Sequence, residues 1–307
     1  MPNPPVTVPA YAKLNLTLAV LGKRADGYHD LASIFQTISL HDTLRITHTS
    51  DGILELKVDD PALQTPHNLA QRAAELLRAE TGDTKFGARI DLLKVIPVQG
   101  GLGGGSSDAG AVLLALNSLW QSDLSTTQLE SLAARLGSDV PYFITGGTAR
   151  IAGRGETVIP LPDLAPLWFV VAKPPVSIST ADIFRRLTPR DYGSPEETDA
   201  IQRAVESGEP LPFDGLIARL SNTLEPVAFA AYPAVRQTRD ALVQAGAPVV
   251  RMSGSGPTLY APFATRAEAE AVYARAQAAN LAVWLCSTVP HVEYRRSILG
   301  TNPGDGP

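Results

Sequence analysis

The sequence is poor in cysteine and in charge, and it has no long hydrophobic run. Cys286 is the single cysteine among 307 residues, which excludes a disulfide framework and a zinc site built from cysteines. No stretch reaches the roughly 18 apolar residues of a membrane span, and residues 1–10 lack the basic and then apolar pattern of a signal peptide. We therefore expect a cytoplasmic protein without a membrane partner.

The charge balance argues against a nucleic-acid partner. The chain has 26 Lys and Arg against 31 Asp and Glu, which gives a net charge of −5. A protein that wraps nucleic acid needs a basic surface, and this composition does not supply one. Hydrophobic residues make up 44% of the chain, which is enough to form a sizeable core. The length of 307 residues predicts one large folded domain or two ordinary ones.

The first half of the chain alternates between strand patterns and helix patterns. Apolar residues at every second position of 14–20 predict a half-buried strand, with Lys13, Asn15 and Thr17 on its other face. Asn68 is a helix cap, Thr127 with Glu130 forms a capping box, and Gly137 ends that helix. Further strands are predicted at 35–40, 43–47, 54–58 and 88–95, and further helices begin at Ser106 or Ser107 and at 138–141.

The second half has the order strand, helix, strand, strand, helix, strand, which is a split βαβ arrangement. Its elements are predicted at 168–172, 233–245, 249–252, 258–263, 265–279 and 281–286, with a helical insertion at about 180–225. The whole is an α+β protein. We place a first domain at 1–162, a second at 163–299, and a disordered tail at 300–307.

Residues 99–107 join a strand to a helix and contain five glycines in the six positions 100–105. Glycines let a backbone approach a ligand closely, and the N–H groups at a helix start bind anions, so this loop predicts a phosphate site. It lacks the lysine of a Walker loop and the glycine spacing of a dinucleotide-binding loop, which argues against an oxidoreductase. The competing interpretation is a flexible connector. A second glycine loop at 253–257 is, taken alone, equally well a tight turn.

Three features are candidates for chemistry. Asp139 is either a helix cap or a base that accepts the proton of a substrate hydroxyl. Lys13 is either a solvated lysine or a charge near a transferred phosphoryl group. Tyr28 and His29 form an ordinary loop or a platform that stacks on a nucleobase. Residue patterns alone do not place Lys13 beside Asp139.

Several segments resemble the GHMP kinase superfamily. They are residues 11–16 with 22–29, 100–109, 136–141 and 251–256, with weaker matches at 176–180, at Phe184 and at 222–225. The resemblance runs from about residue 8 to residue 290. The Lys-Arg-Ala-Asp-Gly-Tyr-His block at 23–29 is similar to the branch that phosphorylates a cytidine-diphosphate-linked methylerythritol.

The resemblance implies a GHMP kinase fold, with a ribosomal-protein-S5-like domain followed by a ferredoxin-like one. It implies ATP-dependent phosphorylation of the 2-hydroxyl of that substrate, in the non-mevalonate isoprenoid route, with Mg²⁺. In this interpretation Asp139 is the base and Lys13 supports it electrostatically. The substrate side comprises Asp139, Asn15, Tyr28, His29, Thr180 and Phe184, with Tyr28 stacking on the base. The ATP side comprises Asn68, Lys94, Gly100, Gly101, Leu102, Gly103, Gly104, Gly105, Ser106 and Ser107, and Ser107 is also the candidate metal ligand.

Two alternatives stay open. One is another GHMP kinase that acts on homoserine, mevalonate or a sugar, and the other is a non-catalytic nucleotide sensor on the same fold. The sequence departs from the resemblance at His67, where an acidic residue is common, and at Gln99, where a small residue is common. We expect a monomer or a weak homodimer, with a small molecule as its partner.

Overall fold

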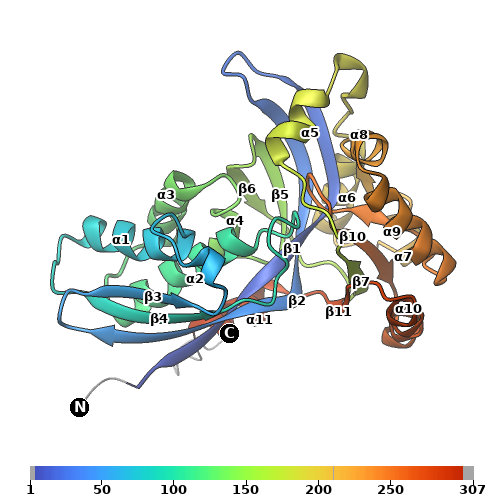
Figure 1. The fold of residues 1–307 in the computed structure, drawn as a ribbon. Helices are drawn as coiled ribbons and strands as arrows, with labels where there is room; N and C mark the ends of the chain where they lie inside the picture. The colour runs from blue at the N-terminus through green and yellow to red at the C-terminus, as the bar shows by residue number, and fades with distance from the viewer. Residues whose placement is uncertain (1–3, 210, 300–307) are drawn as a thin grey trace.

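Two long antiparallel strands, β1 (Val6–Lys23) and β2 (His29–Thr49), run through the middle of the molecule (Figure 1). The computed structural model describes residues 4–209 and 211–299, so the tail predicted at 300–307 lies outside the described residues. The separate strands predicted at 35–40 and 43–47 are one continuous strand. Its pairing with β1 skips two residues opposite Tyr11 and Ala12, so β2 bulges there without ending.

Strand β2 organises the first sheet because its two halves have different neighbours on one edge. Residues 43–49 pair with β4, and residues 31–36 pair with β5. On the far side of β1 a short parallel strand from the second half of the chain, β8, completes the seven-stranded sheet. The remaining strands of this sheet are β3 (Leu54–Val58), β4 (Gly87–Leu93), β5 (Thr148–Gly153), β6 (Thr157–Pro160) and β8 (Ser221–Asn222).

Helices of the first half cover one face of this sheet and bury its largest core, which includes Ile46, Leu77 and Leu116. On the left of Figure 1 they lie beside β3 and β4. A 3₁₀ turn, η1 (Pro61–Leu63), precedes them. These helices are α1 (Leu69–Thr81), α2 (Gly104–Leu119), α3 (Thr126–Leu136) and the single turn α4 (Tyr142–Thr145).

The helix starts only partly follow the sequence prediction. Asn68 caps α1 as predicted, accepting from the N–H of Ala70 at 2.9 Å. Helix α2 begins earlier than predicted, because Gly103 adopts the cap position and the two serines fall inside the first turn. The capping box of α3 is Ser125 with Gln128, not the predicted pair two residues later. Both pairs have suitable chemistry, and the observed one fits where the chain turns.

The second half builds a separate antiparallel sheet in the order β11–β7–β10–β9, with helices α9 and α10 on its outer face (Figure 1). The predicted α+β class and ferredoxin-like arrangement are confirmed. Strand β7 matches its prediction at both ends, whereas β9 is shorter than predicted. The bounds are β7 (Trp168–Ala172), α9 (Pro233–Gln244), β9 (Arg251–Met252), β10 (Leu259–Phe263), α10 (Arg266–Ala278) and β11 (Val283–Ser287).

Strand β1 is buried on both faces, not on one as predicted, since Lys13, Asn15 and Thr17 on its polar face are at most 2% exposed. The second sheet packs against its apolar face. Leu14 and Leu16 share a core with Phe169 and Tyr260 of the second sheet. The Tyr260 hydroxyl also donates to the backbone oxygen of Asn15 at 2.8 Å. On the polar face, the Asn15 amide bonds to Ser33 at 3.0 Å and the Thr17 hydroxyl to Thr198 at 2.8 Å, so these side chains are buried by hydrogen-bonded neighbours.

The insertion lies between the two sheets and is helical, as predicted. Its elements are α5 (Thr180–Arg186), a 3₁₀ turn η2 (Pro189–Asp191), α6 (Glu196–Glu206), α7 (Phe213–Ile217) and α8 (Glu225–Ala231). In Figure 1 helix α5 stands beside the projecting end of the β1–β2 hairpin. Within residues 4–209 and 211–299, no helix combines the length and the apolar character needed to cross a membrane.

The last helix, α11 (His291–Leu299), returns to the first half of the chain. The Tyr294 ring packs on Gly146, and its hydroxyl donates to the backbone oxygen of Phe143 at 2.6 Å. His291 packs on Gly147, and both glycines have a left-handed φ. The division of the chain at residue 162 stays a prediction, with this C-terminal helix attached to the first half.

Replacing Tyr294 tests this attachment. We expect Tyr294→Ala to lower the free energy of unfolding by about 3–5 kcal/mol, because it leaves a cavity where a fully buried ring packs. Tyr294→Phe should cost about 1–2 kcal/mol, because it leaves the oxygen of Phe143 unpaired. Urea unfolding measures both, with Tyr273→Phe on α10 as the matched control. Losses below about 0.5 kcal/mol for both Tyr294 variants would contradict this account.

Candidate active site

The two glycine loops lie against each other, so the second is not merely a hairpin turn. The Thr258 N–H donates to the oxygen of Gly100 at 3.2 Å, and the Ser253 hydroxyl donates to the oxygen of Gly101 at 2.9 Å. A Cβ on Gly101 would collide with the backbone oxygen of Ser253, and Gly101 has a φ of +77°. Glycine is therefore required at this contact. The loop from the second half supports the loop from the first.

The first glycine loop is also fixed to strand β1. The backbone N–H of Lys13 donates to the oxygen of Leu102 at 3.0 Å. Gly103 has a φ of +74°, and a Cβ there would lie 2.7 Å from the Phe143 ring and 3.2 Å from the Lys13 side chain. The loop therefore approaches β1 closely only because residue 103 has no side chain.

Lys13 and Asp139 face each other beside this loop, as the proposed chemistry requires. Their Nζ and Oδ2 atoms are 3.7 Å apart, with the lysine side chain 3% and the aspartate 37% exposed. Asp139 does not cap helix α4, whose cap position is Pro141 with no side-chain bond. Lys13 also donates to Asn15 Oδ1 at 2.6 Å and lies 4.2 Å from the centre of the Phe35 ring.

The burial of Lys13 affects its proton affinity. Burial lowers the pKa of the Lys13 ammonium, and the Asp139 carboxylate opposes this shift without cancelling it. The ammonium is therefore poised to interact strongly with any further negative charge that enters the site.

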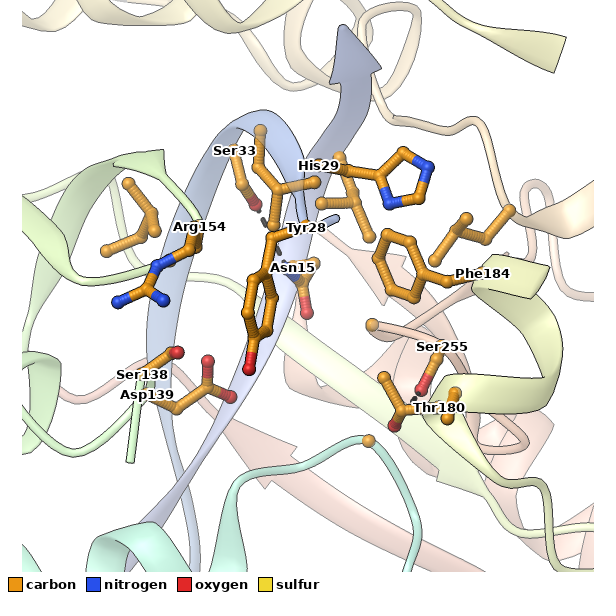
Figure 2. Close-up of a pocket in the computed structure, with 18 of the residues that line it drawn as sticks. Asn15, Tyr28, His29, Ser33, Ser138, Asp139, Arg154, Thr180, Phe184 and Ser255 are labelled. Atoms are coloured by element: carbon orange, nitrogen blue, oxygen red, sulfur yellow. Dashed lines mark hydrogen bonds between the residues drawn. The ribbon is translucent and has the colours of Figure 1, made fainter. Parts of the chain in front are cut away.

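A large cavity of about 660 Å³ opens from this pair toward the β1–β2 hairpin. Figure 2 shows Tyr28 projecting into it from the hairpin and Phe184 from α5, with Asp139 at the lower end. The His29 and Phe184 rings are 5.1 Å apart, and burial together with Lys23 lowers the pKa of His29. The lining of the large cavity includes the predicted substrate-side residues Asn15, Tyr28, His29, Asp139, Thr180 and Phe184.

Two of these residues are already engaged. The Asn15 amide is 2% exposed, accepts from Lys13 and donates to the Ser33 hydroxyl at 3.0 Å. Its clearest role is to hold the Lys13 ammonium. Thr180 shares a hydrogen bond of 2.8 Å with Ser255, so the second glycine loop also reaches this cavity.

A small cavity of about 360 Å³ lies on the other side of the first glycine loop. Gly101 and Gly103 line both cavities, so the loop separates two binding spaces that meet at it. Apolar side chains of Leu63, Leu69 and Val98 form part of the small cavity. Its lining includes nearly all the predicted nucleotide-side residues, namely Asn68, Lys94, Gly100, Gly101, Leu102, Gly103, Gly104, Gly105 and Ser106.

Lys94 lines the small cavity, and its ammonium is already paired with two carboxylates. Its Nζ donates to Asp108 Oδ2 at 2.6 Å and to Asp42 Oδ2. Burial alone would lower the pKa of Lys94, but the two carboxylates outweigh it and raise the pKa. Burial raises the pKa of Asp108 to about 7. This buried triad joins β2, the segment after β4 and helix α2.

Ser107, the remaining predicted residue, lines neither cavity and is fully buried. Its hydroxyl has no hydrogen-bond partner in the part of the chain that the structure describes. This unpaired hydroxyl lies in the first turn of α2 beside the glycine loop, but it does not open into either cavity.

Arg154 was missed by the sequence analysis. Its guanidinium lies over the Tyr28 ring, 4.8 Å from the ring centre, in the turn between β5 and β6 (Figure 2). Lys23 and Arg185 also line the large cavity. The Gly-Arg-Gly sequence at 153–155 indicates a turn, but nothing in it shows where the arginine points.

Comparisons with known proteins agree on one family. The family model of the GHMP kinases N terminal domain matches residues 68–147, and that of the GHMP kinases C terminal matches residues 199–281. The chain is 44% identical to a 4-diphosphocytidyl-2-C-methyl-D-erythritol kinase of Pelotomaculum thermopropionicum, covering 88% of this chain and 93% of that protein.

Solved structures give the same result. A crystal structure of 4-(cytidine 5'-diphospho)-2C-methyl-D-erythritol kinase aligns with a TM-score of 0.79 at 36% identity, covering 92% of this chain and 99% of that one. A homoserine kinase from Cytophaga hutchinsonii aligns with a TM-score of 0.70 at 18% identity, covering 94% and 95%. The second likeness is one of fold alone.

Removing the carboxylate of Asp139 tests the pairing with Lys13. We expect Asp139→Asn to lower the pKa of Lys13 further, because Asp139 stabilises the charged form of the ammonium. Titration of ¹³C-labelled lysine by NMR measures this, with the exposed, remote Asp214→Asn as control. A Lys13 pKa that rises or does not change in Asp139→Asn would show that the two side chains do not interact in solution.

Proposed function

This chain belongs to the GHMP kinase family and within it to the 4-diphosphocytidyl-2-C-methyl-D-erythritol kinases, and we propose that Lys13 and Asp139 carry out its reaction where the two cavities meet. The enzyme transfers a phosphoryl group from ATP to an alcohol of that substrate in the non-mevalonate route to isoprenoid precursors. The Lys13–Asp139 pair at 3.7 Å, beside the glycine loop, is the observation that carries the assignment of the catalytic residues.

The small cavity is the proposed ATP site. Leu63, Leu69 and Val98 offer the adenine an apolar surface, and the glycine loop leads the phosphates toward Gly101. The free N–H groups at the start of α2 favour anions there. Since Gly101 and Gly103 also line the large cavity, the terminal phosphate would face the second substrate across the loop.

The large cavity is the proposed site of the cytidine-bearing alcohol. The Tyr28 and Phe184 rings offer stacking surfaces for the base. Because the pKa of His29 is lowered, its ring is neutral near pH 7 and presents one donor and one acceptor to a base edge. Lys23, Arg154 and Arg185 suit a substrate that carries a diphosphate.

Asp139 is the proposed base. As the substrate oxygen forms its bond to the terminal phosphorus, its proton passes to a carboxylate oxygen of Asp139, and the bond from that phosphorus to the leaving ADP oxygen breaks. Asp139 is the one carboxylate among the described residues that line the large cavity. Its partial exposure leaves room for the hydroxyl to approach.

Lys13 supports the transfer electrostatically. Its buried ammonium lies 3.7 Å from the Asp139 carboxylate and would offset negative charge on the transferring phosphoryl group. Asn15 holds the ammonium by accepting at 2.6 Å, so little reorganisation is needed during the reaction. We assign Asn15 to this positioning role on the substrate side.

The described residues fit Mg²⁺ only in part. No group of three or more His, Cys, Asp or Glu side chains within residues 4–209 and 211–299 is placed to hold a metal ion. The unpaired hydroxyl of Ser107 is the protein ligand we propose, with the ATP phosphates supplying most of the coordination. When bound with ATP, Mg²⁺ neutralises charge on the phosphates.

The alternatives are less well supported. Another alcohol would not need Tyr28, His29 and Phe184 in one cavity, and a nucleotide sensor would not need the Lys13–Asp139 pair. We place the enzyme in the cytoplasm, where ATP is available, as a monomer or weak homodimer whose partner is a small molecule.

A panel of alcohols tests the substrate. The purified protein is given labelled ATP with 4-diphosphocytidyl-2-C-methyl-D-erythritol, homoserine or mevalonate, and phosphorylated product is measured. Turnover with the cytidine substrate alone supports the proposal. A higher kcat/KM with either of the other two alcohols would overturn the assignment of the large cavity.

Asp139→Asn tests the base. We expect kcat to fall by about 10²–10⁴-fold, because an amide does not accept the proton. The dissociation constant of ATP should change little, because Asp139 does not line the small cavity. Steady-state kinetics and ATP titration give both numbers, with the neighbouring Ser138→Ala as control. Turnover within a few-fold of the unmodified enzyme would remove Asp139 from this role.

A further inference from the structure

The small cavity, which the proposed function assigns to ATP, has no uncompensated positive charge among its described lining residues. Lys94 is the one cation there, and the carboxylates of Asp42 and Asp108 hold it. A nucleotide triphosphate carries several negative charges. Within this cavity the protein would therefore contact the phosphates through neutral donors, such as backbone N–H groups and the dipoles of side chains.

Few neutral side-chain donors are available in this cavity. The Asn68 amide is already used, because it accepts from the Ala70 N–H at 2.9 Å and donates to the oxygen of Leu63 at 3.1 Å. Gln99 and Ser106 also line the cavity, and neither side chain makes a hydrogen bond within residues 4–209 and 211–299. Of these two, only Gln99 has a side chain long enough to reach well beyond the backbone.

Gln99 lies where the small cavity meets a third cavity. It lines the small cavity and also a third cavity of about 430 Å³, which Ser177, Ser179 and Ser255 of the second half help to line. Gly101, two residues further on, lines all three cavities. The side chain of Gln99 is therefore next to the part of the loop toward which the phosphates are directed.

The backbone conformation of Gln99 is unfavourable for any residue with a side chain. Its φ is +54°, in the left-handed region where a residue with a Cβ is disfavoured by about 1–2 kcal/mol relative to glycine. Gly101 and Gly103 of the same loop also have a left-handed φ, so the loop uses glycine for this conformation elsewhere. The side chain is exposed, as is that of Gln121, which has a φ of +53° and lines none of the cavities, so this strain supplies a control for the test and is not itself an argument for binding.

We propose that the side-chain amide of Gln99 donates a hydrogen bond to a phosphate oxygen of bound ATP, and so serves as a neutral phosphate-binding group where many nucleotide-binding loops place a lysine. The proposal rests on the assignment of the small cavity to ATP. When phosphates fill the cavity, the amide loses water and gains a charged acceptor. A hydrogen bond to a charged acceptor is about twice as strong as one between neutral groups.

The chain contains a matched control for the test. Gln121, after helix α2, is also exposed and has a φ of +53°, yet it lines none of the three cavities. Substitutions at Gln121 therefore change the same side chain in the same backbone conformation, away from the site. Gln→Gly at either position relieves the backbone, whereas Gln→Ala keeps the strain and removes the amide.

The experiment measures the dissociation constants of ATP and of adenosine for Gln99→Ala, Gln99→Gly, Gln99→Glu and the Ala and Gly variants of Gln121. We expect Gln99→Ala and Gln99→Gly to weaken ATP binding about tenfold and to leave adenosine binding unchanged. Gln99→Glu, which has the same size, should weaken ATP binding more than alanine does, because a carboxylate repels phosphate. Both Gln121 variants should bind ATP normally.

Three results would overturn the proposal. One is unchanged ATP affinity in Gln99→Ala, and another is an equal loss for ATP and adenosine, which would indicate a displaced loop. The third is normal ATP affinity in Gln99→Gly beside a loss in Gln99→Ala, which would make backbone strain the cause. Thermal melting shows whether each variant folds. If the unmodified enzyme binds ATP but does not phosphorylate the cytidine substrate, the proposed function fails while this binding test still decides the role of Gln99.

Discussion

The backbone hydrogen bond from Lys13 to Leu102 is the contact on which the site depends. It fixes the glycine loop to the central strand at 3.0 Å, and the ammonium of the same residue lies opposite Asp139. Lys13 therefore fixes both the position of the glycine loop relative to β1 and the position of the positive charge. This contact requires glycine at position 103, because any side chain there would collide with Lys13 and Phe143. The proposed phosphoryl transfer therefore depends on the close approach of the β1 backbone and the backbone of the glycine loop.

The two cavities differ in charge among their described lining residues. In the small cavity, carboxylates neutralise the one lysine, so in the proposed binding mode the phosphates of ATP would meet neutral groups of the loop. The large cavity contains Lys13, Lys23, Arg154 and Arg185 against the single carboxylate of Asp139 among its described lining. In the proposed mechanism a phosphoryl group that crosses the loop moves from a neutral environment toward a positive one. The positive charge of the large cavity would stabilise the negative charge of the transferring group.

The sequence predicted local features well and spatial ones only through the resemblance. Strand β7 follows from a short run of apolar residues, and the helix expected at 265–279 begins where Thr265 and Glu268 form a capping box; both are properties of a few adjacent residues. The continuity of β2 across residues 41–42 was not predicted, because the polar side chains of His41 and Asp42 interrupt the apolar pattern there, although both residues pair with β1. Arg154 and the Asp42–Lys94–Asp108 triad were missed, since their partners come from separate segments and no local pattern indicates them.

The second half of the chain contributes to catalysis through support rather than through reacting groups. Asn222, on the strand that pairs with β1, donates to the backbone oxygens of Met252 and Gly254, both at 2.8 Å. These bonds fix the second glycine loop, whose Ser253 donates to Gly101. A line of contacts thus runs from the insertion through one glycine loop to the other. Because Gly101 leaves no room between the loops, a shift of the second half would displace the first glycine loop, which is the proposed phosphate site. The two halves must therefore stay packed for the loop to keep its shape.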